Sequence, residues 1–399
     1  MKTKLNLAVA SALLAVASSA NAGIMIPAGD WTLDIGGVVN TYYTSTRTSG
    51  DDIALGGNAV NLGGGNANGE TGTNNITTGL LPNYLSVSGK TRQNDLDVGF
   101  TISINPGSST RNSGIQSAQQ ENRQAFVTFG DKSWGSIKLG KDLGIFASDA
   151  ILNDMTLLGV GSGAGFLAGN TTTLGRIGTG FIYADWISQI AYSSPNFNGF
   201  SFTAGVTQSW DALNITGADA GGAGREGSVP AFEGKVSYEW AGDFGGKVWA
   251  SAITQKLEVS TGGDETVRGY DLGATVNVAG FGLTGYAYDG KGLGTTVLML
   301  GALDQNGKRR DSDGYYVQGT YTLPGVGTKL GVSYGESELD ANSGDVLAGD
   351  LENSMWTVGA YHPLTKHLNL VAEYSNVETD FGSLESKAKT VSLGAILFF

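Results

Sequence analysis

Cysteine is absent from this 399-residue chain, and histidine and proline are scarce, at two and seven residues. Without cysteine there is no disulfide framework and no thiolate metal site. The two histidines, His362 and His367, flank one short segment, which leaves little from which to build a histidine-assisted nucleophile or a zinc site. We therefore expect neither an enzyme nor a protein that depends on a cofactor or metal.

Positive charge is also in short supply. The chain has 24 lysine and arginine residues against 37 aspartate and glutamate residues, a formal net charge of −13. Nucleic-acid binding needs a basic surface, so this composition argues against a nucleic-acid partner. Glycine is abundant instead, at 63 residues, which favours many strands and turns over a helical protein.

Long hydrophobic runs are missing after residue 22. The one apolar run, 5–17, follows two lysines and precedes Ala20-Asn21-Ala22, which is typical of a cleaved secretory signal peptide. A transmembrane anchor is the alternative, but the run is too short to span a bilayer. We predict a signal peptide over 1–22 and one mature domain over 23–399. Because only helices and closed barrels satisfy their backbone in lipid, that domain is either an exported soluble protein or a membrane β-barrel.

What the sequence does contain is alternation with a period of two. From Leu96 to Ile104 the even positions are all apolar and the odd positions are polar or small, as in a strand with one apolar face. Sixteen such segments can be marked: 30–45, 82–92, 95–105, 122–130, 134–140, 186–194, 199–210, 230–240, 246–257, 266–279, 281–289, 313–323, 328–337, 352–362, 367–378 and 388–399. Ten residues tilted by about 40° rise roughly 25 Å, the height of the apolar band of an outer-membrane barrel. We therefore predict an all-β fold, a transmembrane antiparallel β-barrel of sixteen strands.

The connections between these segments alternate in length. Those after even-numbered segments are tight turns such as Gln93-Asn94 and Gly280, whereas those after odd-numbered segments are mostly long, 141–185 being the longest. Short turns on the periplasmic side and long loops outside are typical of bacterial barrels. A secreted all-β protein would explain the alternation equally well, but it would not explain this sorting of the loops.

Four parts of the chain resemble general porins of Gram-negative outer membranes. They are the strand-turn-strand at 192–202, the pair 123–127 and 135–141 leading into the third long loop, the hairpin 361–374 and the closing strand 393–399. The resemblance implies a homotrimer of sixteen-stranded barrels in the outer membrane, each with the third loop, 141–185, folded into the lumen. It implies a water-filled channel for passive diffusion of ions and small hydrophilic solutes, with no cofactor.

The acidic side of the pore constriction is expected on the third loop. Asp149 and Asp154 resemble the family's two loop aspartates, and Asp142 lies nearby, whereas the glutamate that follows in the family is replaced by Leu157-Leu158-Gly159. Charge at the narrowest point of a pore sets selectivity because low dielectric strengthens it. The alternative is that these residues are ordinary solvated loop charges.

The basic side of the constriction is expected on the barrel wall. Arg123 and Lys141 match two basic positions of the family, a further arginine is replaced by Tyr84, and another is missing where Tyr183 and Trp186 stand. This thinned basic wall, together with the net negative charge, predicts a weak preference for cations and a partly aromatic lining.

The remaining expectations concern assembly and partners. Phe399 ends the last segment in phase with Leu393 and Leu397, and a C-terminal phenylalanine is, by the family resemblance, the signal read by the barrel-assembly machinery. Small residues of the first and last strands would allow close approach in the trimer (Gly36, Gly37, Gly99, Ala125, Gly394 and Ala395). Outer-membrane lipid and lipopolysaccharide would surround the trimer, and the basic triplet 308–310 is one candidate contact with lipopolysaccharide.

Other functions stay open at this stage. A substrate-specific channel of the same fold is the first alternative. An outer-membrane barrel enzyme and a secreted adhesin are less favoured, because the sequence offers no catalytic constellation and its loop lengths are sorted by parity.

Overall fold

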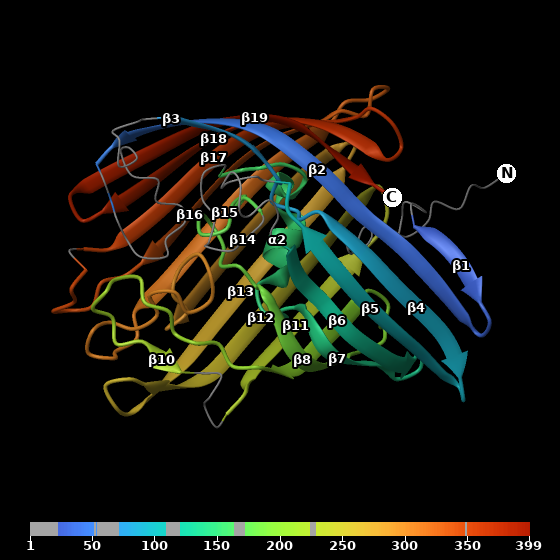
Figure 1. The fold of residues 1–399 in the computed structure, drawn as a ribbon, viewed down its shortest axis with the longest axis horizontal. Coiled ribbons are helices and arrows are strands. Elements are labelled where there is room, and N and C mark those ends of the chain that lie inside the picture. Colours follow the sequence, from blue (N-terminus) through green and yellow to red (C-terminus); the bar gives the residue numbers. More distant parts are fainter. Residues whose placement is uncertain are drawn as a thin grey trace.

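The computed structural model describes residues 23–51, 53, 72–108, 120–162, 172–223, 229–347 and 349–399, so the predicted signal peptide lies outside the described residues. Within these ranges, nineteen strands form a single sheet. Sixteen of them close into an antiparallel barrel (Figure 1). The prediction of a sixteen-stranded barrel is therefore confirmed.

The barrel strands follow one another around the ring in chain order. They are β2 Trp31–Gly50, β4 Tyr84–Gln93, β5 Leu96–Pro106, β6 Gln120–Asp131, β7 Gly135–Leu143, β8 Trp186–Ser193, β9 Phe200–Thr207, β11 Ala231–Trp240, β12 Phe244–Val259, β13 Asp264–Val278, β14 Phe281–Lys291, β15 Asp311–Thr322, β16 Lys329–Leu339, β17 Leu351–Pro363, β18 Leu368–Phe381 and β19 Leu384–Phe398. Each overlaps one of the sixteen alternating segments, because the alternation is set by the barrel's two faces.

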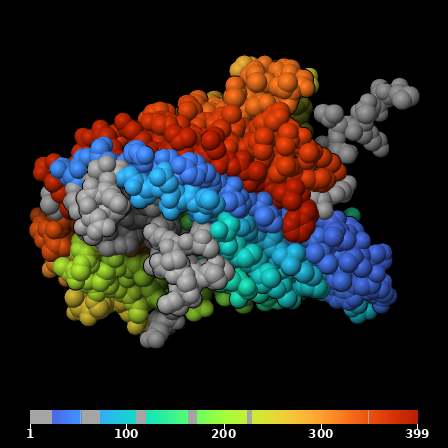
Figure 2. Space-filling view, turned by 45° about the horizontal axis from the view of Figure 1, so that its top comes forward, coloured from blue at the N-terminus to red at the C-terminus, as the bar shows by residue number. Residues whose placement is uncertain are grey.

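The ring closes where β19 pairs with β2. The pairing runs from Ser386 opposite Gly50 to Phe398 opposite Val38. Figure 2 shows the result on the surface, with the first strands in blue beside the last in red. Closure removes both sheet edges, so every strand of the wall finds backbone partners on both sides.

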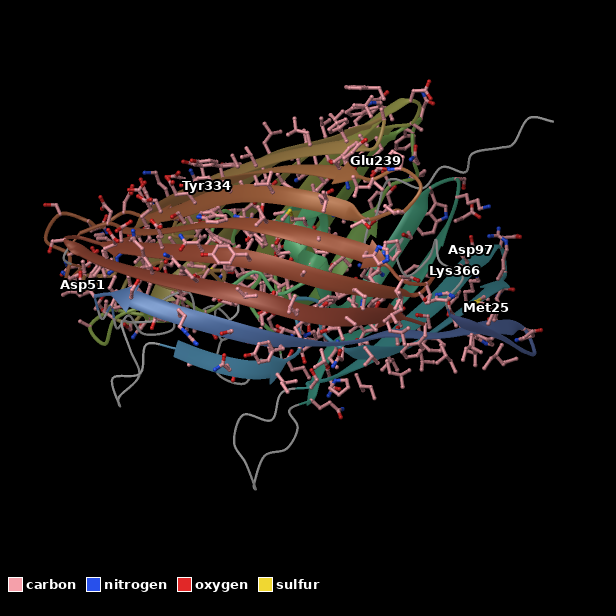
Figure 3. The ribbon with its side chains drawn as sticks, turned by 90° about the horizontal axis from the view of Figure 1, so that it is seen from above. Met25, Asp51, Asp97, Glu239, Tyr334 and Lys366 are labelled. Atoms are coloured by element: carbon pink, nitrogen blue, oxygen red, sulfur yellow. The ribbon has the colours of Figure 1, made fainter. Side chains whose placement is uncertain are left out.

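The long loops all lie at one end of the barrel, as their parity predicted, and the connections at the other end are all short. In Figure 3, Asp97, beside the β4–β5 turn, and Lys366, in the β17–β18 turn, lie at one end with Met25, and Asp51, where the first long loop starts, lies at the other. We call these the turn end and the loop end. The β4–β5 turn is tight because Asn94 and Asp95 both take positive φ, at 49° and 62°, which matches the twist of a two-residue hairpin.

Side chains alternate between an apolar outside and a more polar inside. In β13, Tyr270 and Leu272 are 58% and 65% exposed, whereas Asp271 between them is buried in the lumen. Toward the loop end Tyr315, Tyr334 and Trp356 form part of an outer aromatic girdle (Tyr334 is labelled in Figure 3). An apolar outer surface with aromatic girdles fits a lipid environment. A soluble protein has the opposite arrangement, with its polar side chains outside.

Three further strands extend the wall. β1 Ile24–Ala28 forms a hairpin with β2 and projects at the turn end, while β3 Gly72–Thr77 and β10 Gly222–Ala223 lengthen the wall beside β2 and β12. Inside the barrel lie the helix α2 Ser148–Asn153 and the 3₁₀ turn η1 Met155–Leu158. Among the described residues, no helix has both the length and the apolar character needed to cross a membrane.

The C-terminal residue takes part in closing the ring. The Gly37 N–H donates to the Phe399 carbonyl at 2.7 Å, and the Phe399 N–H donates to the Gly37 carbonyl at 3.0 Å. A Cβ at Gly37 would lie 2.8 Å from the Phe399 ring, so only glycine fits there. Leu393 and Leu397 are exposed on the outer face, and Phe399 is half-buried against Gly37.

We expect deletion of Phe399 to lower the yield of folded barrel, because it removes both hydrogen bonds and the predicted assembly signal. The measurement is the heat-modifiable fraction in isolated outer membranes. Phe399→Tyr, which keeps the main chain and the aromatic ring, is the control and should assemble normally. A wild-type yield from the truncated chain would contradict the assembly role.

Candidate functional site: the pore constriction

The third loop crosses the lumen because carboxylates on the wall bind its main chain. The N–H groups of 145–146 donate to Glu233 at 2.8 and 2.9 Å, and those of 160–161 donate to Glu373 at 2.7 and 2.9 Å. Glu233 is on β11 and Glu373 on β18, on well-separated parts of the ring. Buried N–H groups need acceptors, so Glu233 fixes the loop where it enters the lumen and Glu373 fixes it again at 160–161 on another part of the wall.

Asp149 holds α2 against the wall. Its carboxylate accepts from Lys235 of β11 at 3.0 Å and from Lys247 of β12 at 2.6 Å. Burial raises the pKa of Asp149, but the two lysines more than offset this and hold the pKa below its usual value. The residue is therefore a paired anchor of the loop and does not offer a free charge to the pore.

Asp154 is also buried in an internal pair. It caps η1 by accepting from the Thr156 N–H at 3.0 Å, and it lies 3.9 Å from the Arg176 guanidinium. Burial raises the pKa of Asp154, and Arg176 and Thr156 offset this only in part. Its side chain is inaccessible to solvent, which does not fit the predicted role in the constriction.

Arg123 enters the lumen through a β-bulge. Gln124 pairs with Ser103, but the next pairing joins Glu121 with Asn105, so β6 carries one extra residue between them. A bulge of this kind redirects a side chain. As a result Arg123 and Gln124, which are neighbours in sequence, both line the same cavity.

The aromatic residues beside the predicted basic wall contact Arg123. Its guanidinium donates to Glu121 at 2.7 Å and to the Tyr183 hydroxyl at 3.3 Å, and lies 5.9 Å from the centre of the Trp186 ring. The Trp186 indole donates to Tyr183 at 2.8 Å. Tyr183 and Trp186 therefore supply part of the lining where the family arginine is missing, together with Tyr84.

The remaining predicted residues separate to the two faces of the wall. Asp142 points inward, pairs with Lys138 and accepts from Gln124 at 3.0 Å. Lys141 lies opposite Ala125 and Ser188, both exposed on the outside, and donates to the Asn122 carbonyl. It is not among the residues that line the cavity.

The open part of the lumen lies between the third loop and the wall. It is a cavity of about 390 Å³. One side is apolar and comes mainly from the third loop, including Ile145, Ile151 and Leu152, while the wall contributes mostly polar side chains of β4 to β9 and β11. This cavity, with Arg123 and Asp142 among the residues that line it, is the candidate constriction.

A family model of Gram-negative porins matches residues 8–382. The chain belongs to this family. It is an outer-membrane channel for passive diffusion. No curated protein sequence matches it.

Solved structures of other porins share the fold at low identity. The outer membrane channel DcaP of Acinetobacter baumannii has a TM-score of 0.68 at 18% identity, covering 94% of this chain and 99% of that one. The anion-selective porin from Comamonas acidovorans has 0.60 at 17%, covering 92% and 100%. OmpF of Salmonella typhi, solved in complex with daunomycin, has 0.54 at 15%, covering 93% and 100%.

The porin's loop 292–310 also folds into the lumen, which the sequence analysis did not predict. The Tyr183 N–H of the third loop donates to the Thr296 carbonyl at 2.9 Å, and Leu293 and Met299 are buried in the same apolar cluster as the third loop. The signal was the apolar run 297–300 inside a loop assigned to the surface.

Arg310 fastens that loop to its neighbours. Its buried guanidinium binds Asp219 at 2.9 Å and Asp345 at 2.7 Å, from two other loops, and donates to two main-chain carbonyls. Arg309 is paired with Glu265 at 2.8 Å. Of the basic triplet, Lys308 has the most exposed side chain, so the triplet offers lipopolysaccharide less charge than its sequence suggests.

The structure changes the expected effect of one substitution in the porin and supplies the reason for the effect of another. Sequence alone predicts that Asp154→Asn shifts the reversal potential toward anions, but the buried position predicts no shift. Asp149→Asn should shift it toward anions, because Lys235 and Lys247 lose their shared partner. Both are measured in planar bilayers under a salt gradient. A shifted potential for Asp154→Asn would show that this carboxylate does face the pore.

The anchor at Glu373 should control how far the third loop narrows the porin. Glu373→Ala leaves the two N–H groups of 160–161 and the Tyr361 hydroxyl without their acceptor, at about 1–3 kcal/mol for each buried group. We expect a larger and noisier single-channel conductance. Glu373→Gln keeps an acceptor oxygen and serves as the control. Unchanged conductance in the alanine variant would mean that other contacts hold the loop.

Proposed function

We propose that ions and small hydrophilic solutes cross this porin through the cavity between the third loop and the wall of β4 to β9. The observation that carries the proposal is the two-point attachment of the third loop at Glu233 and Glu373, which commits the loop to one path through the lumen. The cavity beside that path is lined by polar wall side chains. Family and fold support a channel and not an enzyme.

We further propose that ion preference is weak. The predicted cation preference depended on Asp149 and Asp154 facing the pore, and both are buried. Around the cavity, Arg123 and Lys138 each pair with a carboxylate, which leaves little uncompensated field. The porin from Comamonas acidovorans is anion-selective, so this fold does not by itself imply a preference for cations.

A reversal potential measures this preference. In a tenfold salt gradient an ideally selective channel would give about 59 mV. We expect a small fraction of that value, because Arg123, Lys138 and Lys235 at the cavity are each paired with a carboxylate. A potential near the ideal limit, of either sign, would contradict the proposal and would indicate an unpaired charge at the constriction.

The homotrimer remains a proposal. OmpT of Vibrio cholerae has been solved in a trimer form with the same fold. On this chain, Gly37, Ala125 and Ala395 lie in the outward register of the expected interface, whereas Gly36, Gly99 and Gly394 lie in the inward one. Gly37 itself is buried against the Phe399 ring. Exposed apolar residues of β2, β5 and β19 surround the two alanines (Val39, Tyr43, Ile102, Leu393). Close approach would therefore depend on these apolar side chains more than on glycine.

We expect cross-linking in mild detergent to give a trimer and conductance to appear in triple steps. Ala125→Trp should weaken the trimer, because it adds bulk on the proposed interface. Ala287→Trp is the control, since Ala287 is exposed in the outward register of β14, away from that interface. One species at the mass of a single chain, with single conductance steps, would refute the trimer.

A further inference from the structure

The cavity has two chemically different sides that meet near α2. On the loop side, Ser148, Ile151 and Leu152 line the cavity, and their spacing places them on one face of the helix. On the wall side, Lys138 of β7 and Lys235 of β11 line it. Two apolar side chains of the helix, Ile151 and Leu152, and two ammonium groups of the wall therefore line one cavity.

The inward side chains of the wall between the two lysines are small. β8 and β9 separate β7 from β11, and their inward residues in this part of the cavity are Ala191, Ser193 and Thr203. Thr203 pairs with Lys235 on one side and with Ser193 on the other. These three small side chains lie between the two lysines, and all five residues line the same cavity.

The lysines are more accessible than the carboxylates that pair with them. The Lys138 side chain is 30% exposed against 11% for Asp142, and the Lys235 side chain is 26% exposed against 4% for Asp149. Lys235 donates to Ser148 and Asp149, and an ammonium group has three donors. A solute in this part of the cavity would therefore meet donors before it meets acceptors.

We propose that this part of the cavity, bounded by Lys138, Lys235, Ile151 and Leu152, is a subsite for small carboxylates with an apolar body. The carboxylate lies between the two ammonium groups, and the body packs on the Ile151 and Leu152 face of α2. The inference rests on the proposed function, because the solute must reach this cavity through the channel. A cavity of about 390 Å³ is within the usual range for small-molecule sites.

The acidic groups near the subsite are already paired, which argues against binding of a cationic solute there. Asp142 is held by Lys138 and Gln124, and Asp149 by Lys235 and Lys247, so neither is left to bind a cationic solute. Asp34 lines the cavity from β2, on a distant part of the ring from β11. A cation of the same shape should therefore bind this part of the cavity less well than the anion.

The test is block of the single-channel current by four probes. Benzoate has the charge and the apolar body, acetate lacks the body, benzyl alcohol lacks the charge, and benzylammonium reverses it. We expect benzoate to block at a lower concentration than the other three. Equal block by benzyl alcohol or benzylammonium, or by acetate, would overturn the assignment of chemical class.

Variants locate the site. Lys138→Gln and Lys235→Gln should each raise the half-blocking concentration of benzoate by roughly tenfold. Lys247 still holds Asp149 in the Lys235 variant, and Gln124 still binds Asp142 in the Lys138 variant. Leu152→Asn should weaken block by benzoate and leave block by acetate unchanged.

The control is Lys256→Gln, which removes the same charge from an exposed position of β12, paired with Asp264 outside the cavity. It should leave benzoate block unchanged. Conductance without benzoate block, or equal effects of Lys256→Gln and Lys138→Gln, would overturn the subsite while the channel function stands. Absence of conductance from correctly assembled protein would overturn the proposed function and this inference with it.

Discussion

Buried main-chain groups need hydrogen-bond partners, and in this porin that requirement acts twice. In the wall it requires closure, because a sheet edge in lipid would leave N–H and C=O groups unpaired. In the lumen it requires the wall to supply acceptors for any loop that enters. Glu233 and Glu373 each receive two consecutive N–H groups of the third loop. The polar face of the wall therefore holds the loop as well as facing water.

Holding the third loop in the lumen also occupies carboxylates that the sequence alone would assign to ion selectivity. Asp149 and Asp154 are both buried, one against two wall lysines and one near Arg176. A carboxylate paired in this way contributes little net field to a passing ion, because the opposite charge lies within a few ångströms. What distinguishes sites in the lumen is then the accessibility of each partner, and along β7 and β11 the lysines are the more accessible ones.

The strands were predictable because their period has one physical cause, lipid on one face and the lumen on the other. The residues of the pore constriction were less predictable from the sequence. Arg123 lines the cavity only because β6 bulges beside it, and Lys141 faces outward by the regular alternation of β7 with Ala125 and Ser188. Whether a loop carboxylate is exposed or paired depends on wall residues far away in sequence, such as Lys235 for Asp149. No sequence motif marked Lys235 or Lys247 as a partner of the loop, although the alternation of β11 and β12 predicts that both side chains point inward.

The width of the pore follows from the loops more than from the barrel. Sixteen strands can enclose an aqueous channel, but here the third loop and 292–310 share one apolar cluster inside the ring. They are joined through Tyr183 and Thr296, and the second loop is fastened by Arg310 to two others. These contacts join the loops inside and above the lumen into one connected set. The cavity that these loops leave is lined mainly from β4 to β9 and β11, by residues that include Arg123, its aromatic neighbours and two lysines.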